Sequence, residues 1–300
     1  VSAALVLPAA ALVSGPYTAD SNTVYLFHLD EAAGASVSTN SVTGGASLIA
    51  FNGSTLPSSN NTTQPALTTV LGSSGVSGFG NAAAISNVTY GLGLDVNGSS
   101  GFQPGNSTTT SPPDSVSQSS LAAADGSFTL EALINLPSIS VKREIISTDS
   151  SLTNRCFQFY TDINGTMKFN FIGGSGTTAS ATIPTTGVNA FVANEWFHVA
   201  YVFNGTTSVS TFYWTRVTST NTQANALVTT GTETMMPAYV GPLVIGNEGR
   251  GASGEGLLGL IDEVRISKVA RTASQFIFAS DDTDADGLPD TWEILQFGNL

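Results

Sequence analysis

The stretch FQFYTDINGTMKFNF, from Phe157 to Phe171, shows most directly which kind of fold this chain adopts. Phenylalanines alternate with polar residues on both sides of Asn164-Gly165, as in a β-hairpin with one buried face. A two-residue loop would place Phe159 opposite Asn170 and mix the two faces, whereas a three-residue loop pairs Phe159 with Phe169. We therefore predict a hairpin with the three-residue loop 163–165, in which Gly165 takes a positive φ.

Further strand patterns lie on both sides of this hairpin. Phe128 to Leu136 alternates apolar and polar residues, interrupted by Leu133, and predicts a half-buried antiparallel strand. Trp196 to Phe203 is apolar on both faces, as a central strand would be, and Asn204-Gly205 then leads into a return strand over 210–217. Other strands are expected over 23–31, 243–246 and 257–267, whereas 32–127 holds only weak apolar islands and 97–120 reads as a surface loop. Short strands without crossover helices indicate a β-sandwich.

The composition excludes several classes of protein. The 300 residues include 9 Lys+Arg and 22 Asp+Glu, for a net charge of −13, so the chain is a poor partner for the phosphates of nucleic acids. A hydrophobic fraction of 41% is enough for a core and argues against global disorder. The single cysteine, Cys156, excludes an internal disulfide and a CxxC metal site. No apolar run reaches the ~18 residues that span a bilayer.

Both ends of the chain resemble cuts from a longer precursor. Residues 1–15, VSAALVLPAAALVSG, carry an apolar stretch and small residues at 9–11, as at the end of a secretory signal peptide. The alternative is a first strand, which Pro8 disfavours. We therefore expect a secreted or cell-surface protein, with a signal remnant at 1–15, a β-sandwich at 16–280, a truncated calcium loop at 281–300 and further domains beyond Leu300.

Several segments in their order resemble one known domain family. They are VYLFHLDEAAGASVSTNS, FTLEALINLPS, FQFYTDINGTMKFNF, NEWFHVAYVFNG, GPLVIGNEG and GLLGLIDEVRISKVART, and the piece at 261–266 is the most specific. Together they resemble the LamG-like jelly-roll domain of the concanavalin A-like lectin/glucanase superfamily, over about residues 20–280. The resemblance implies an all-β, two-sheet antiparallel jelly-roll sandwich. It also implies binding of glycans or proteins outside cells, often with calcium and mostly without catalysis.

The sharpest local motif lies near the end of the chain. Residues 282–293 fit D-x-[DN]-x-[DN]-G-x5-E, in which closely spaced oxygens suit the ~6–8 ligands of Ca²⁺. The alternative is a solvated acidic tail, which needs neither this spacing nor Gly287. The segment resembles thrombospondin type 3-like, dockerin-like and EF-hand-like loops, with a helix starting at Thr291. The predicted calcium ligands are Asp282, Asp284, Asp286, the Leu288 carbonyl, Asp290 and Glu293.

A second acidic position is Asp262. In LGLIDEVRI it falls on the apolar parity, so its carboxyl group is expected to face inward. A buried carboxylate needs donors or a cation. Two interpretations stay open, backbone hydrogen bonds that fix the sandwich or a ligand of a calcium site, and the first is favoured. Asp30 is a candidate neighbour, because the resemblance implies that the first and last strands pair.

Sugar binding calls for an exposed aromatic ring with polar neighbours. The candidates are Trp214, Tyr213 and Tyr239, with Arg250 nearby in sequence. The alternative for each ring is packing within the core or on a sheet face.

No pair of catalytic acids stands out. The E-x-D-x-x-E strand of the superfamily's glucanases does not occur, and Glu131 stands alone on its strand. We therefore expect that the chain is not an enzyme. The favoured function is a secreted binding or adhesion module for a glycan, cell-surface or extracellular-matrix component, with calcium at the Asp-rich loop. The alternatives are a structural spacer or surface-layer module rigidified by calcium and, less favoured, a glycoside hydrolase.

Overall fold

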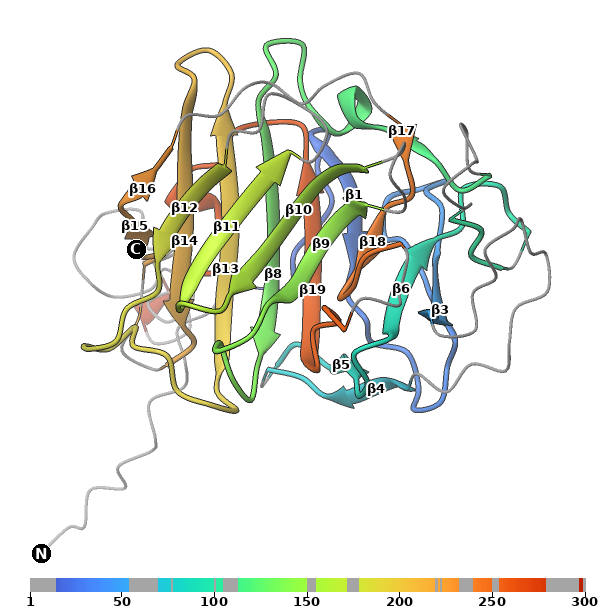
Figure 1. Ribbon diagram of the computed structural model, residues 1–300, viewed down its shortest axis with the longest axis horizontal. Helices are drawn as coiled ribbons and strands as arrows, with labels where there is room; N and C mark the ends of the chain where they lie inside the picture. Colours follow the sequence, from blue (N-terminus) through green and yellow to red (C-terminus); the bar gives the residue numbers. More distant parts are fainter. Residues whose placement is uncertain are drawn as a thin grey trace, which may run out of the picture.

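Two large antiparallel sheets pack face to face (Figure 1). The computed structural model of the protein describes residues 15–53, 70–76, 78–99, 101–104, 113–149, 155–171, 178–218, 221, 223–231, 240–249, 254–278 and 297–298. The expected two-sheet antiparallel jelly-roll sandwich is confirmed, and helix is confined in these residues to short turns.

Sheet A contains eight strands among the described residues. They are β1 (Thr23–Phe27), β4 (Val70–Ser74), β5 (Asn81–Ile85), β8 (Phe128–Asn135), β13 (Trp196–Asn204), β14 (Val209–Arg216), β15 (Ala226–Leu227) and β19 (Gly259–Ser267). The spatial order is β15–β14–β13–β8–β19–β5–β4, and β1 also pairs with β19. The first strand thus lies against the last long one, as the resemblance implied.

Sheet B contains nine strands among the described residues, in the order β16–β12–β11–β10–β9–β18–β6–β3–β2. They are β2 (Val37–Ser38), β3 (Leu48–Asn52), β6 (Tyr90–Leu94), β9 (Arg143–Asp149), β10 (Arg155–Asp162), β11 (Thr166–Phe171), β12 (Thr178–Thr182), β16 (Thr229–Thr230) and β18 (Val244–Ile245). A small ribbon pairs β7 (Val116–Ser117) with β17 (Val240–Gly241). The 3-10 turns are η2 (Gln118–Leu121) and η3 (Ala273–Gln275).

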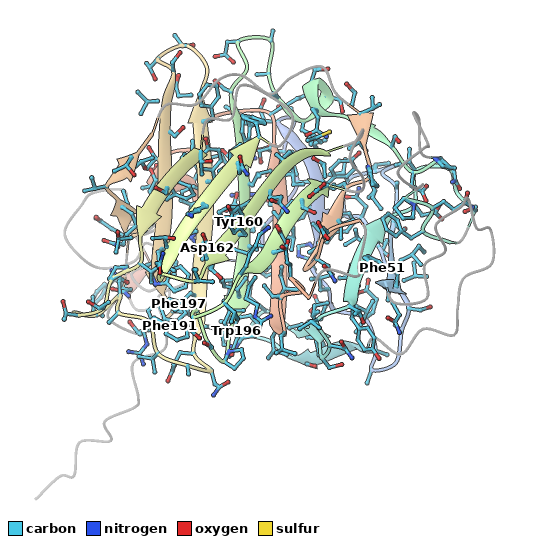
Figure 2. The ribbon with its side chains drawn as sticks, in the orientation of Figure 1. Phe51, Tyr160, Asp162, Phe191, Trp196 and Phe197 are labelled. Atoms are coloured by element: carbon cyan, nitrogen blue, oxygen red, sulfur yellow. The ribbon has the colours of Figure 1, made fainter. Side chains whose placement is uncertain are left out.

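Aromatic rings from both sheets fill the core between them. Phe169 of sheet B stacks on Tyr201 of sheet A with ring centroids 4.1 Å apart, and Phe128 lies 5.6 Å from Phe169. Burial of each such side chain contributes roughly 1.5–3 kcal/mol. Phe191 and Phe197, labelled in Figure 2, stack at 6.0 Å and extend the aromatic packing along sheet A. The alternation seen in the sequence therefore supplies the inner face of each sheet.

The register of the central hairpin agrees with the prediction. Phe157 pairs with Phe171 and Phe159 with Phe169, across the three-residue loop 163–165. Gly165 has φ 62°. Strand β13 lies between β8 and β14, as expected for a strand that is apolar on both faces. Hairpin and central strand together fix the middle of both sheets.

Strand β8 differs from the prediction of a half-buried strand, which was wrong. Both of its faces are buried, and the polar side chains of Thr129 and Glu131 are fully inaccessible. The cause is a cover formed by residues 15–20 and 271–278, which we call the terminal segments. Tyr17 and Phe276, one from each, are at most 8% exposed and pack against the outer face of sheet A.

A β-bulge in β19 reverses the predicted orientation of Asp262. Glu263 has φ 47°, and the pairing of β19 with β8 shifts between Asp262 and Arg265. Ile261 and Val264 consequently face the core, with two residues between them. Asp262 points to the outer face of sheet A, buried beneath the loop that joins β4 to β5. The expectation of an inward carboxyl group was wrong, because strict alternation fails at the bulge.

Candidate functional sites

A buried polar cluster lies under the terminal segments, centred on Glu131. Its carboxylate accepts hydrogen bonds from Arg265 Nε at 2.6 Å and from the Tyr17 hydroxyl at 2.6 Å. His198 Nε2 lies 3.2 Å from the same carboxylate. Burial alone would raise the pKa of Glu131, but the charge of Arg265 and the hydrogen bond with His198 lower it. The carboxylate is thus held ionised inside the protein.

This cluster joins both terminal segments to sheet A. The Ile277 amide donates to the Tyr17 hydroxyl at 3.1 Å, and Arg265 donates to the Gln275 carbonyl at 2.8 Å. The Arg265 guanidinium also lies 3.6 Å from the centre of the Tyr17 ring. These side chains are buried, and their contacts hold the cover in place.

Sequence reasoning missed this cluster. It placed Glu131 alone on its strand, whereas β13 and β19 bring His198 and Arg265 to its two sides. Each partner lies more than 60 residues away in sequence. The register Arg265↔Glu131 depends on the bulge at Glu263, so the alternation pattern alone gave no signal for this pairing.

The aromatic residues predicted as a sugar platform lie inside the protein. Trp214 is fully buried, and its indole N–H donates to the Asn189 carbonyl at 3.1 Å. Tyr213 is 9% exposed, and the Phe276 ring covers it at 4.9 Å. Neither ring therefore offers a platform for a sugar. The other expected residues lie outside the described part of the chain: Tyr239, Arg250, Asp282, Asp284, Asp286, Leu288, Asp290 and Glu293.

An oxygen-lined niche surrounds Asp262, next to the loop 75–81. A methyl group on Gly75 would lie 2.8 Å from the Gly80 carbonyl oxygen and 2.9 Å from both the Asn81 carbonyl oxygen and Asp262 Oδ2. Three oxygens therefore converge on one side of Gly75. Asp30 holds the other end of the loop, because its Oδ1 accepts the Asn81 amide at 2.8 Å.

The Asp262 carboxyl group has few hydrogen-bond partners in this niche. Its Oδ1 accepts the Glu263 amide at 2.7 Å, but Oδ2 has no hydrogen-bond partner among the described residues. Burial raises the pKa of Asp262 to about 9, and the nearby charges of Glu263 and Asp30 act in the same direction. No group of three His, Cys, Asp or Glu side chains with the geometry of a metal site occurs in the described residues, so a cation here would depend on carbonyl oxygens. Such oxygens suit a hard cation.

The outer face of sheet B carries polar side chains in the middle of the sheet. Tyr160 and Asp162, labelled on β10 in Figure 2, lie on this strand beside Lys168 of β11. The Lys142 ammonium lies 4.6 Å from the centre of the Tyr160 ring and forms ion pairs with Glu144 at 2.9 Å and Glu255 at 2.7 Å. The charges on this part of the face are thus paired with each other.

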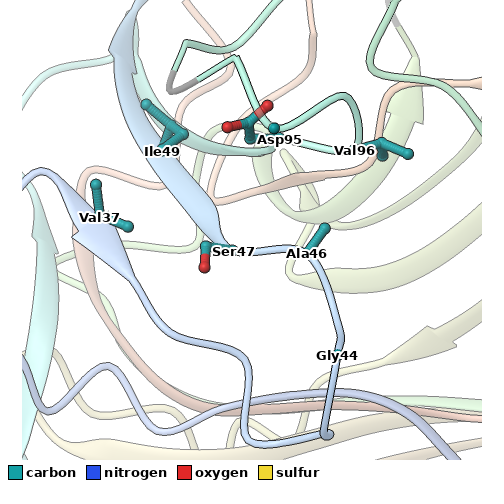
Figure 3. Close-up of a pocket in the computed structure, with 8 residues that line it drawn as sticks. Val37, Gly44, Ala46, Ser47, Ile49, Asp95 and Val96 are labelled. Carbon is teal, nitrogen blue, oxygen red and sulfur yellow. The ribbon is translucent and has the colours of Figure 1, made fainter.

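A hollow of about 410 Å³ opens beside β3, where sheet B ends (Figure 3). We call it the β3 hollow. It combines aliphatic walls, two glycines, one hydroxyl and one carboxylate, from Val37, Gly44, Ala46, Ser47, Ile49, Asp95, Val96 and Gly98. Val37 and Val96 are 41% and 42% exposed, so the aliphatic rim is open to solvent. Sequence reasoning missed it, because its walls come from two segments nearly 50 residues apart.

The walls of the β3 hollow are held by hydrogen bonds. The Asp95 amide donates to the Ser47 carbonyl at 2.9 Å, which joins the two walls. Asp95 Oδ1 accepts the Ser99 amide at 3.0 Å. Behind this loop, the buried Asp114 carboxylate accepts the Asn97 amide at 3.1 Å and the Gln103 amide. The site is thus organised before any ligand arrives.

The comparisons with known proteins agree with this architecture. The family described as the concanavalin A-like lectin/glucanases superfamily matches residues 105–276, more than half of the chain. The chain belongs to this superfamily. Strands β1 to β6 precede the matched residues but complete the same two sheets, so the superfamily sandwich extends toward the amino end. Curated protein sequences give no match to this chain.

Several solved structures match this chain at low sequence identity. Trypanosoma rangeli sialidase in complex with sialic acid matches with a TM-score of 0.50 and 11% identity, over 90% of this chain and 34% of the sialidase. A mutant of that sialidase displaying trans-sialidase activity gives 0.48 and 12%, over 89% and 34%. The botulinum neurotoxin serotype D ligand binding domain with N-acetylneuraminic acid gives 0.45 and 11%, over 85% and 49%. The chain thus spans about a third of the sialidases.

These neighbours correct the expectation that the chain is not an enzyme. A sialidase shares this fold at a TM-score of 0.50, so the fold and a missing E-x-D-x-x-E strand do not exclude catalysis. At 11% identity this likeness establishes the fold alone. Among the described residues, the structure has no helix with the length and apolar character needed to cross a membrane.

Proposed function

We propose that this chain is a carbohydrate-binding domain and that its ligand site is the β3 hollow. The observation that supports the proposal is a hollow of about 410 Å³, with one carboxylate and one hydroxyl among aliphatic walls, in a member of the lectin/glucanases superfamily. This volume lies within the ~300–1,000 Å³ of small-ligand sites. A sugar ring presents an apolar C–H face and hydroxyl groups, which match the valines and the Asp95 carboxylate.

A pair of valine substitutions tests the site. Val96→Arg places a long side chain at the rim of the hollow, whereas Val188→Arg adds the same charge and bulk at another exposed valine, 49% accessible. A glycan array first identifies a saccharide, and isothermal titration calorimetry then measures its affinity for both variants. We expect at least about a tenfold loss in Val96→Arg and no change in Val188→Arg. Equal binding by the two variants would refute the site.

Calcium is the second part of the proposal. The niche around Asp262, with Asp30 at the end of its loop, offers converging oxygens and a buried carboxyl group whose Oδ2 has no hydrogen-bond partner among the described residues. The Asp-rich loop supplies the other site through Asp282, Asp284, Asp286, the Leu288 carbonyl, Asp290 and Glu293. Extracellular calcium modules work at roughly 10⁻⁴–10⁻³ M, which fits a secreted or cell-surface protein.

Calorimetric titration of Ca²⁺ into the full chain separates these two sites. The wild type is expected to bind two ions. The single variant Asp262→Asn is expected to lose the ion of the niche, and the double variant with Asp284→Asn and Asp286→Asn is expected to lose the ion of the Asp-rich loop. Unchanged stoichiometry in a variant contradicts the corresponding site. If calcium raises the melting temperature while no saccharide binds, the spacer or surface-layer role replaces carbohydrate binding.

A further inference from the structure

A buried carboxyl group joins two stretches of backbone behind the β3 hollow, residues 95–99 and 101–104. Asp114 is fully buried, and its Oδ1 accepts the Asn97 amide at 3.1 Å. Its Oδ2 accepts the Gln103 amide, and the Asp114 amide donates in turn to the Gln103 carbonyl at 3.3 Å. One oxygen of Asp114 thus holds the first stretch, and the other oxygen holds the second.

The first of these stretches forms a wall of the hollow. Asp95, Val96 and Gly98 line it. Asn97, whose amide Asp114 holds, lies between Val96 and Gly98 in the chain. Asp114 itself does not line the hollow. It therefore acts on the wall through the backbone, from behind.

This arrangement needs both oxygens of Asp114 as acceptors. An ionised carboxylate accepts hydrogen bonds at both oxygens, whereas a protonated carboxyl group carries an O–H donor on one of them. Protonation would set that donor near an amide that also donates, so the hydrogen bond to Asn97 or to Gln103 would weaken. The wall as the structure shows it therefore belongs to the ionised form of Asp114.

The charge of Asp114 changes close to neutral pH. Burial raises the pKa of Asp114 from 3.8 to about 6. The backbone amides of Gln103, Asn97 and Val96 lower this pKa, and the negative charge of Asp95 raises it. A modest acidification therefore protonates the group that holds the wall.

We propose that the ionised carboxylate of Asp114 positions the wall of the β3 hollow, so that the hollow binds its saccharide in neutral solution and releases it in acid. This inference rests on the proposed function and adds the regulation of the same site. A saccharide that contacts Val96 and Gly98 finds them in place while both oxygens of Asp114 accept. Asp114 is a positioning residue, because it acts through the backbone.

Stability and affinity should respond to the charge of Asp114 in opposite directions. The pKa of Asp114 is higher in the folded protein than the unfolded value of 3.8. The group therefore contributes stability that is present below the unfolded pKa and is lost as pH rises through about 6. Affinity should instead increase over the same range, because binding needs the ionised form. If Asp114 served stability alone, affinity would follow stability.

Calorimetric titration of the full chain between pH 4.5 and 7.5 tests the proposal. The probes are lactose, maltose and cellobiose, which are neutral and do not ionise in this range. With a pKa of about 6, about 3% of the molecules have an ionised Asp114 at pH 4.5, so we expect binding there to be roughly tenfold to thirtyfold weaker than at pH 7.5. The midpoint of the change should lie near pH 6.

Two matched variants assign the effect to one residue. Asp114→Asn replaces one acceptor oxygen by a donor and is expected to bind weakly at both pH values. A pH dependence caused by Asp95 would persist in this variant. Asp125→Asn is the control, because the exposed Asp125 also accepts a backbone amide, that of Ser127 at 2.9 Å, but does not line the hollow. This control is expected to keep the wild-type profile.

Amide NMR follows the wall without a ligand. The signals of Asn97 and Gln103 should shift with a common midpoint near pH 6 in the wild type and should not do so in Asp114→Asn. These shifts together with the change in affinity support the proposal. If none of the three sugars binds, the amide signals decide the role of Asp114.

Three results would overturn the proposal: an affinity that is equal at both pH values, a pH dependence that remains in Asp114→Asn, or amide signals that do not titrate. In these cases Val96→Arg still blocks binding. Binding that Val96→Arg leaves intact refutes the proposed function instead.

Discussion

The two outer faces of this sandwich differ in whether the terminal segments cover them. The outer face of sheet A is covered by the terminal segments, and Glu131 and Arg265 beneath them are buried and paired. The outer face of sheet B keeps its polar middle uncovered by these segments and opens into the β3 hollow at one end. Both faces carry acids. The difference lies in the cover, because the terminal segments close over Glu131 and Arg265 on one face, whereas Lys142 and Lys168 pair with acids on the other face outside these segments.

The same fold thus contains a covered charge cluster around Glu131 and an open hollow lined by Asp95. A buried carboxylate such as Glu131 is tolerated because the Arg265 cation and the Tyr17 hydroxyl both donate to it, and removing either partner would be destabilising. The Asp95 carboxylate, by contrast, accepts the backbone amide of Ser99 and lines an open hollow, although the residue is only 8% exposed.

The largest effect is expected for Glu131→Ala. The substitution leaves Arg265 buried without its counter-ion, which costs roughly 3–5 kcal/mol in the free energy of unfolding. Urea denaturation followed by circular dichroism measures it. The control is Glu195→Ala, whose exposed ion pair contributes about 0–1 kcal/mol. Similar losses of unfolding free energy in Glu131→Ala and Glu195→Ala would show that the buried cluster contributes no more to stability than an exposed ion pair.

A pH dependence is expected from Asp114, on the open face. Its pKa in the folded protein is raised by burial from 3.8 to about 6. The group therefore contributes stability that is fully present below its unfolded pKa and is lost as pH rises through about 6. The difference in unfolding free energy between the wild type and Asp114→Asn should change by roughly 2–3 kcal/mol between pH 4 and 7.5. A difference that does not change with pH contradicts this assignment.

Gly93→Ala tests the packing beside the β3 hollow. A methyl group there would lie 2.2 Å from the Phe102 ring, which covers this glycine on the outer face of sheet B. The ring must shift, at a cost of about 1–3 kcal/mol. In a double-mutant cycle, Phe102→Leu should reduce the cost of Gly93→Ala by half or more. Full additivity of the two substitutions would show that this contact does not set the local shape.

The smallest effect is expected for Tyr17→Phe, on the sealed face. The hydroxyl donates to Glu131 at 2.6 Å and accepts the Ile277 amide at 3.1 Å. Its removal leaves a buried amide without its partner, which costs about 1–2 kcal/mol. Hydrogen exchange should show faster exchange of the Ile277 amide. Unchanged protection there would mean that the hydroxyl does not hold the cover.

The sequence predicted what alternation and turn chemistry control. The pairing of Phe159 with Phe169 followed from a period of two and from the need for glycine at position 165. Asp262 was misplaced because the bulge at Glu263 adds a residue without changing the composition of the strand. The bulge is evident in the strand pairing and in the backbone dihedral angles of the structure, but the alternation of apolar and polar residues in the sequence does not reveal it.

The sites were harder to predict, because tertiary cover decides them. Trp214 and Tyr213 are residue types that often bind sugars. The Trp214 ring lies inside the sandwich, however, and the Tyr213 ring lies beneath Phe276. The β3 hollow left a weak signal in Asp95-Val96-Asn97-Gly98-Ser99, a run of turn-forming residues around one valine. Only the approach of residues 37–49 turns that loop into a site.

The sealed face also determines how the molecule can be attached. Gly15 lines a hollow with Arg265 and Phe276, so both terminal segments meet on the back of sheet A. A tether joined through either segment would leave from that side and present the β3 rim toward the surroundings. Immobilisation of the domain through these segments should therefore leave the β3 hollow accessible to solvent.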